Sequence, residues 1–187
     1  PFDEKTLKIL ESQLPANTLS TRKISLFTMV ATKDQSRLVQ VTGIEQDYPF
    51  YGKMILKNVG TVDSAKLKQS LVLSGEAWVY PELLYMLELN AGEYIKIGEQ
   101  SFRIADTVVV DPSSSFSSFG LAPRIYLGYS HMEETGLLTK KSRVSHQRLY
   151  RVPEGTDLSG LVEKLQKQIN KFDGSNSAGI SVEWVVG

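Results

Sequence analysis

Cysteine is absent from these 187 residues, and its absence excludes several kinds of site. Disulfides, thiolate metal ligands and cysteine nucleophiles all require that side chain. The absence does not indicate a compartment, because a cysteine-free chain suits the cytoplasm and the periplasm equally. A chain of this length can bury a large apolar core, so we expect it to fold without disulfides or structural metal.

Long apolar runs are also missing. No stretch approaches the roughly 18 uninterrupted apolar residues that indicate a transmembrane helix. The chain opens on Pro1, Phe2 and Asp3, with neither an initiator methionine nor the apolar core of a signal peptide. This opening is expected of a processed chain or of an excised segment, and equally of a trimmed cytoplasmic protein.

The chain has no excess charge of either sign. Its 21 lysine and arginine residues equal its 21 aspartate and glutamate residues, so the formal net charge is zero. Bulk electrostatics therefore give no reason to expect nucleic acid as a partner. The content of 41% hydrophobic and 22% charged residues is that of an ordinary soluble domain.

Histidine is scarce, and the usual catalytic patterns are absent. The chain holds two histidines. His146 lies among arginines, and His131 with Glu134 offers two metal ligands at most, which do not make a site. We expect both histidines to be polar surface residues. No serine lies in a Gly-x-Ser-x-Gly or Ser-x-x-Lys pattern, and no phosphate-binding glycine loop is present. The sequence therefore predicts no catalytic residue, no cofactor site, no metal site and no enzyme activity.

The two ends of the chain have a similar predicted pattern of helix and strand. Apolar residues at helical spacing predict a helix from Asp3 to Leu14, ended by Pro15. Alternation predicts a hairpin around the polar turn 33–36, with Ile24, Leu26 and Val30 on one face and Phe27 and Met29 on the other. Near the end, Asp157 is a plausible N-cap for a helix reaching residue 172, and residues 180–186 alternate as a strand.

The middle of the chain is richer in strands. We expect a polar connection over residues 58–74, a strand at 77–80 and a helix at 81–89 that starts on Pro81. Short strands follow at 94–98, 102–110 and 124–128, which is typical of a small barrel-like β unit. The fold class predicted is α+β, with two parts. Residues 1–60 and 145–187 form a porter-like α/β domain, with helices on a small mixed sheet, and residues 61–144 form an inserted β-rich, barrel-like subdomain.

Two surface features are candidate contact sites. Phe116 and Phe119 are large apolar groups in a polar, serine-rich segment. They either fold back onto the β-rich part or contact a partner, a lipid or an apolar ligand. Arg143 and Arg148 belong to a basic run, which is either a solvated face or a surface that meets acidic lipid headgroups or an acidic partner.

Seven short motifs occur in an order that resembles a known family. They are FTMV (27–30), QDYPFYG (46–52), GEAWV (75–79), LELNAGEYIKIG (87–98), APRIYL (122–127), TGLL (135–138) and SRV (142–144). The series resembles the extracytoplasmic domain of ABC transporter permeases of the MacB/FtsX-like superfamily, in its YbbP-like branch. The resemblance extends from about Phe2 to Val152. It departs from the family at Lys140 and Lys141, where members often carry Pro-Gly.

The resemblance implies a periplasmic domain of an inner-membrane protein that performs no chemistry. A separate cytoplasmic ABC ATPase would supply energy, and a second permease copy would complete the transporter. The domain would serve the export or membrane extraction of a hydrophobic substrate, or mechanotransmission to a periplasmic partner protein. Two alternatives stay open from the residues alone. The first is a stand-alone periplasmic binding module for an apolar ligand or a protein. The second, less supported, is a hydrolase without a recognisable motif.

Overall fold

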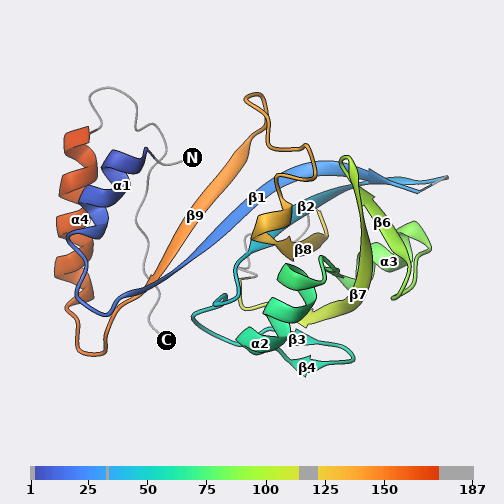
Figure 1. Cartoon of the computed structure of the whole chain (residues 1–187), viewed down its shortest axis with the longest axis horizontal. Helices are drawn as coiled ribbons and strands as arrows, with labels where there is room; N and C mark the ends of the chain where they lie inside the picture. Colours follow the sequence, from blue (N-terminus) through green and yellow to red (C-terminus); the bar gives the residue numbers. More distant parts are fainter. Residues whose placement is uncertain (1–2, 33, 114–121, 173–187) are drawn as a thin grey trace. The chain divides into compact units, whose positions relative to one another are not determined.

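A computed structural model of the chain describes residues 3–32, 34–113 and 122–172 (Figure 1). The chain divides into two compact units. Unit 1 comprises Pro1–Ser20 and Tyr150–Gly187, and unit 2 comprises Thr21–Leu149. The predicted division at residues 60 and 144 stays a prediction, because compactness alone does not decide which residues form a porter-like part. Each unit is described here by itself.

Unit 1 contains helices α1 (Glu4–Glu11) and α4 (Leu158–Phe172). Asp3 caps α1 by accepting a hydrogen bond from the backbone N–H of Thr6 at 3.0 Å. Asp157 caps α4 in the same way through the N–H of Gly160, as predicted. The hydroxyl of Tyr150 donates to Glu11 Oε1 at 2.9 Å. This bond joins the start of the second segment of unit 1 to α1. The strand predicted at 180–186 lies outside the described residues.

Unit 2 is built on a mixed sheet. The order of its strands is β4-β3-β7-β5-β8-β2-β1-β9, with β6 paired to β7 beside this path. β2 with β8 and β5 with β7 are parallel pairs, and β1 with β2, β5 with β8 and β6 with β7 are antiparallel. The strands are β1 (Leu19–Ala31), β2 (Ser36–Ile44), β3 (Ile55–Leu56), β4 (Gly60–Thr61), β5 (Ala77–Val79), β6 (Tyr94–Ile97), β7 (Gln100–Val110), β8 (Arg124–Gly128) and β9 (Val144–Arg151). The mixed sheet with helices confirms the α+β prediction.

The predicted barrel-like character of the middle is wrong, because the sheet is not closed into a barrel. Among the strands that the structure describes, the path has two ends, β4 and β9, instead of returning on itself. The sequence pattern of short, closely spaced strands is shared by barrels and by open sheets, and only the pairing distinguishes them.

Both faces of the sheet carry an apolar core, because successive side chains of a strand point to opposite faces. On β8, Ile125 and Leu127 belong to one core while Tyr126 belongs to the other. The first core is covered by helix α3 (Pro81–Leu87), which inserts Leu83 and Leu87 and contacts β2 and β7 (Figure 1).

The second core is covered by a helical segment that the sequence did not predict. Residues 58–74, expected to be a connection, contain α2 (Ser64–Leu67) and a π-helix, η1 (Lys68–Leu73). Leu67 of α2 and Leu71 of η1 are fully buried. Two apolar residues four apart are too weak a pattern to indicate a helix, and packing on the sheet stabilises it instead.

The hairpin of β1 and β2 has the two faces that alternation predicted. Ile24, Leu26 and Val30 are buried. Phe27 and Met29 point the other way and are 52% and 56% exposed. The register pairs Phe27 with Gln40, and Gln40 in turn with Arg124 of β8. This register brings the polar side chains of β2 and β8 together on one face.

Candidate functional site

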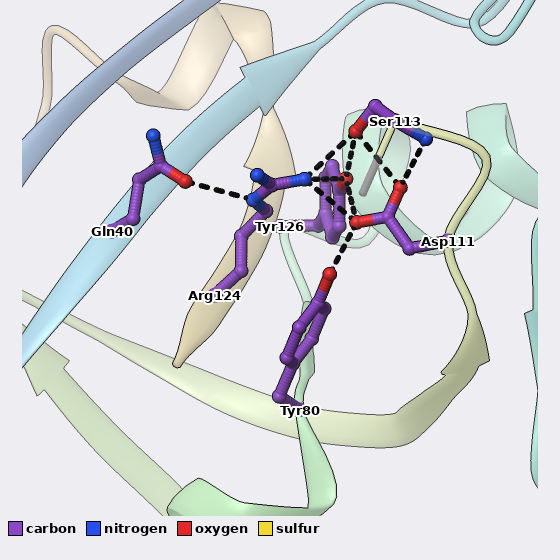
Figure 2. Close-up of polar contacts among 6 residues, drawn as sticks. All are labelled: Gln40, Tyr80, Asp111, Ser113, Arg124 and Tyr126. Atoms are coloured by element: carbon purple, nitrogen blue, oxygen red, sulfur yellow. Dashed lines mark hydrogen bonds and ion pairs between the residues drawn. The ribbon is translucent and has the colours of Figure 1, made fainter. Parts of the chain in front are cut away.

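A partly buried group of polar side chains lies on this face of unit 2, and we call it the Arg124 cluster (Figure 2). Four segments contribute: β2, the residue after β5, the residues after β7, and β8. Its members are Gln40, Tyr80, Asp111, Ser113, Arg124 and Tyr126.

Sheet register explains why these residues meet. Arg124 and Tyr126 are two apart on β8, so both point to the same face. Gln40 is the cross-strand partner of Arg124. Tyr80 follows β5, and its backbone N–H donates to the carbonyl of Arg124 at 3.0 Å. Asp111 follows the last residue of β7, which runs parallel to β5.

An ion pair between Arg124 and Asp111 forms the centre of the cluster. Arg124 Nη1 lies 2.7 Å from Asp111 Oδ2, and the side chains are 8% and 3% exposed. Arg124 Nη1 also donates to Ser113 Oγ at 2.7 Å and to the Tyr126 hydroxyl at 3.0 Å. Its Nε donates to Gln40 Oε1 at 2.9 Å. The guanidinium therefore connects β8 with β2 and with the end of β7.

The carboxylate of Asp111 is surrounded by donors. The hydroxyls of Tyr80 and Tyr126 each donate to Oδ2 at 2.6 Å. The backbone N–H and the hydroxyl of Ser113 each donate to Oδ1 at 2.8 Å, which closes an Asx turn. A carboxylate with both oxygens engaged in this way is poorly placed to act as a general base.

Electrostatics keep the pair charged. Burial acts to raise the pKa of Asp111, but the hydrogen bonds from Tyr126 and Tyr80 and the charge of Arg124 outweigh it and hold the pKa below its usual value. Burial, together with the neighbouring Tyr48 and Asp111, raises the pKa of Tyr126 well above its usual value. Near neutral pH Asp111 is therefore a carboxylate and Tyr126 a neutral phenol.

A second cation lies next to the cluster. Lys23 Nζ is 5.6 Å from the centre of the Tyr48 ring, and that ring is 6.4 Å from the ring of Tyr126. Burial, with repulsion from Arg124 and a smaller opposing effect of Asp111, lowers the pKa of Lys23 to about 8. Chemically, the site offers hydrogen bonds and charge, which suits positioning or binding better than bond making.

Of the residues singled out from sequence, Arg143 and Arg148 are not members of the cluster. Phe116 and Phe119 fall outside the described residues. Arg143 is exposed in the turn before β9, and Arg148 is half-buried within β9. The Arg124 cluster itself was not predicted as a site. The sequence features that could have indicated it are Asp111, directly after the long strand β7, and Arg124, at the start of β8.

The two histidines differ from the surface positions expected for them. His131 is only 20% exposed in its side chain, because it packs between two glycines and against Phe102. His146 is half-buried in β9, and burial lowers its pKa. Among residues 3–32, 34–113 and 122–172, no three side chains of the metal-ligating types gather into a candidate metal site.

Comparison with known proteins finds that the chain is similar to one ABC transporter permease. No family model matches it. It is 28% identical over 124 residues to the ABC transporter permease YbbP of Escherichia coli (strain K12). This match covers 66% of the chain but only 14% of that permease. None of the helices in the described part of the chain has the length and apolar character that a membrane span requires.

Two solved structures share the fold. One is the extracellular domain of the ABC-type transporter YknZ from Gram-positive bacteria, with a TM-score of 0.59 and 12% identity over 95% of this chain and 87% of that one. The other is the periplasmic region of MacB from Actinobacillus actinomycetemcomitans, with a TM-score of 0.57 and 15% identity over 93% of this chain and 75% of that one. At such identity these two structures establish the fold alone.

Proposed function

We propose that this chain, an FtsX/MacB-type periplasmic domain by sequence and fold, couples cytoplasmic ATP hydrolysis to work on the periplasmic side of an ABC transporter permease. That work is export or membrane extraction of a hydrophobic substrate, or mechanotransmission to a periplasmic partner. The observation that carries the proposal is the sequence match to an ABC permease in a chain that also has the fold of a MacB periplasmic region.

The proposal implies partners outside this chain. A cytoplasmic ABC ATPase supplies the energy, and a second permease copy completes the transporter. Hydrophobic segments that flank this domain in the full reading frame connect it to the ATPase and hold it at the inner membrane. The Arg124 cluster suits such a role, because it ties strands β2 and β8 and the end of β7 together, and a stiff body transmits movement better than a soft one.

Spin labels on the full permease test the coupling directly. The domain has no cysteine, so a single Tyr85→Cys substitution, at a side chain that is 89% exposed, gives one label in each domain copy. Flanking cysteines in the full permease would be replaced first. We expect the distance between the labels of two permease copies to change between the nucleotide-free and the vanadate-trapped ATPase. A label at Leu73, 63% exposed, provides an independent second site in unit 2.

Unchanged label distances at both sites, with the ATPase fully trapped by vanadate, would refute the coupling.

The alternative function, a stand-alone periplasmic binding module, predicts a different organisation of the gene. Its reading frame would encode a signal peptide and a stop codon close to the end of this chain, with no flanking spans. The sequence of the flanking DNA therefore separates the two functions before any assay.

The contact residues predicted from sequence remain part of the proposal. We propose that Phe116 and Phe119, with Arg143 and Arg148, meet a lipid-like substrate or a partner protein. Flotation with vesicles of anionic phospholipid tests the lipid form. We expect the double variant Phe116→Ser, Phe119→Ser to lose vesicle binding, and Tyr85→Ser, which removes an exposed aromatic residue elsewhere, to keep it. Equal binding by both variants would exclude the phenylalanines as the contact.

A further inference from the structure

His131 joins two segments of unit 2 that are far apart in sequence. It is the last residue of the short 3₁₀ helix η3 (Tyr129–His131). Its Nε2 lies 2.9 Å from the carbonyl oxygen of Val72, in the last turn of the π-helix η1. Its Nδ1 lies 3.2 Å from Oε2 of Glu134, in the turn that follows η3.

Both ring nitrogens of His131 therefore face acceptors. A carbonyl oxygen and a carboxylate can only accept, and a neutral imidazole has a single N–H to donate. The tautomer with a proton on Nε2 leaves a lone pair against the carboxylate of Glu134, and the other tautomer leaves one against Val72. Only the imidazolium, with both nitrogens protonated, donates to both partners at once.

We propose that His131 is a proton-operated latch between η1 and the turn 132–136. When the ring carries two protons, it bonds Val72 and Glu134 and holds the turn to the π-helix. When the ring loses one proton, one of the two bonds is lost. Glu134 is the partner released, because its side chain is 57% exposed and can hydrate, whereas the partly buried carbonyl of Val72 would be left without a donor.

The surroundings of the ring favour a discrete latch over a loose contact. A Cβ atom on Gly75 would lie 3.3 Å from Cε1 of the ring, and one on Gly128 would lie 3.2 Å from Cδ2. The ring of Phe102 meets the imidazole edge-on, with centroids 6.5 Å apart. Glu134 is the charged side chain in direct contact with the ring among the described neighbours, and the end of η1 adds the partial negative charge of a helix C-terminus.

The turn that the latch holds is itself fastened to another part of the unit. The backbone carbonyl of Thr135 accepts from the N–H of Glu99, in the turn between β6 and β7, at 2.9 Å. A Cβ atom on Gly98 would lie 2.0 Å from that same carbonyl oxygen, so the two turns are in close contact. Protonation of His131 thus adds the Glu134 bond to a series of contacts that runs from η1, through the turn 132–136, to the β6–β7 turn. This inference does not depend on the proposed transport function.

Nuclear magnetic resonance tests the latch with few signals, because the chain has two histidines and His146 serves as an internal reference. Histidine changes charge between about pH 5 and 8. In the chain labelled with ¹⁵N, we expect both ring N–H groups of His131 at pH 5 to exchange more slowly than those of His146. In the neutral ring a single N–H should remain, on Nε2. The amide signals of residues 132–136 should shift together with the titration of this ring.

Matched variants decide the outcome. Glu134→Gln should abolish the shared titration of the turn amides, whereas Glu133→Gln, which neutralises the neighbouring exposed carboxylate, should leave it intact. If the two variants behave alike, or if the ring N–H groups of His131 exchange as fast as those of His146 at pH 5, the latch does not exist.

Discussion

Arg124 Nη1 lies 2.7 Å from Oδ2 of Asp111, and neither side chain is more than 8% exposed. Two opposite charges taken out of water in this way stabilise a structure mainly when every remaining donor and acceptor finds a partner. Tyr80, Tyr126, Ser113 and the pair itself provide those partners. The pair therefore constrains the geometry of the sheet.

Removal of one member of this pair should be costly. Arg124→Met leaves the carboxylate of Asp111 buried without its cation, and we expect a loss of about 3–5 kcal/mol in the free energy of unfolding. Arg22→Met is the control, since Arg22 and Glu45 are 47% and 29% exposed and such pairs contribute about 0–1 kcal/mol. Urea unfolding followed by circular dichroism measures both. Equal losses would show that the Arg124 pair is no more important than a surface pair.

Lys23 should make stability rise with pH in the alkaline range. Its pKa is lowered to about 8 in the folded chain, so between about pH 8 and its ordinary value of 10.5 the unfolded chain binds more protons than the folded one. The free energy of unfolding contributed by Lys23 therefore increases as pH rises through this window. The difference in stability between the wild type and Lys23→Met should grow in favour of the wild type from pH 7.5 to 9.5. A difference that stays constant would show that Lys23 titrates normally.

Asp106 should be a strong determinant of the turn between β3 and β4. Its carboxylate is 1% exposed and accepts from the backbone N–H groups of Asn58, Val59 and Thr107. Asp106→Ala removes the acceptor of the buried Thr107 N–H and of the partly buried N–H groups of Asn58 and Val59. Each unpaired buried donor costs about 1–3 kcal/mol, so we expect a loss of about 3 kcal/mol. Asp63→Ala, which removes only the N-cap of α2, should cost about 1 kcal/mol. Thermal unfolding that ranks the two variants in the opposite order would contradict this account.

Adjacent residues of β1 should differ sharply in their tolerance of substitution. Leu26 is 4% exposed in one core, and Leu26→Ala should cost about 2–5 kcal/mol. Phe27 is 52% exposed on the other face, and Phe27→Ser should change stability by about 0.5 kcal/mol or less. Urea midpoints of the two variants measure the contrast. A large loss for Phe27→Ser would mean that this ring packs against something in solution.

Local patterns predicted much of the fold. Alternation placed the β1–β2 hairpin and separated Phe27 from Leu26, and helical spacing with Asp157 as N-cap placed α4. These features depend on residues a few positions apart, so they can be predicted without knowing which distant residues they contact. The α2–η1 segment was missed, because its helical state depends on the sheet beneath Leu67 and Leu71.

By itself, the sequence determined the α+β class, most strand and helix positions, and the resemblance to FtsX/MacB-type permease domains, since each is encoded in short patterns and their order. Tertiary structure alone decided that the sheet stays open, that Arg124 meets Gln40 and Asp111, and that His131 reaches Val72. These contacts join residues between 13 and 84 positions apart. Strand register and the burial of charge select such contacts, and neither property is visible in any local stretch of sequence.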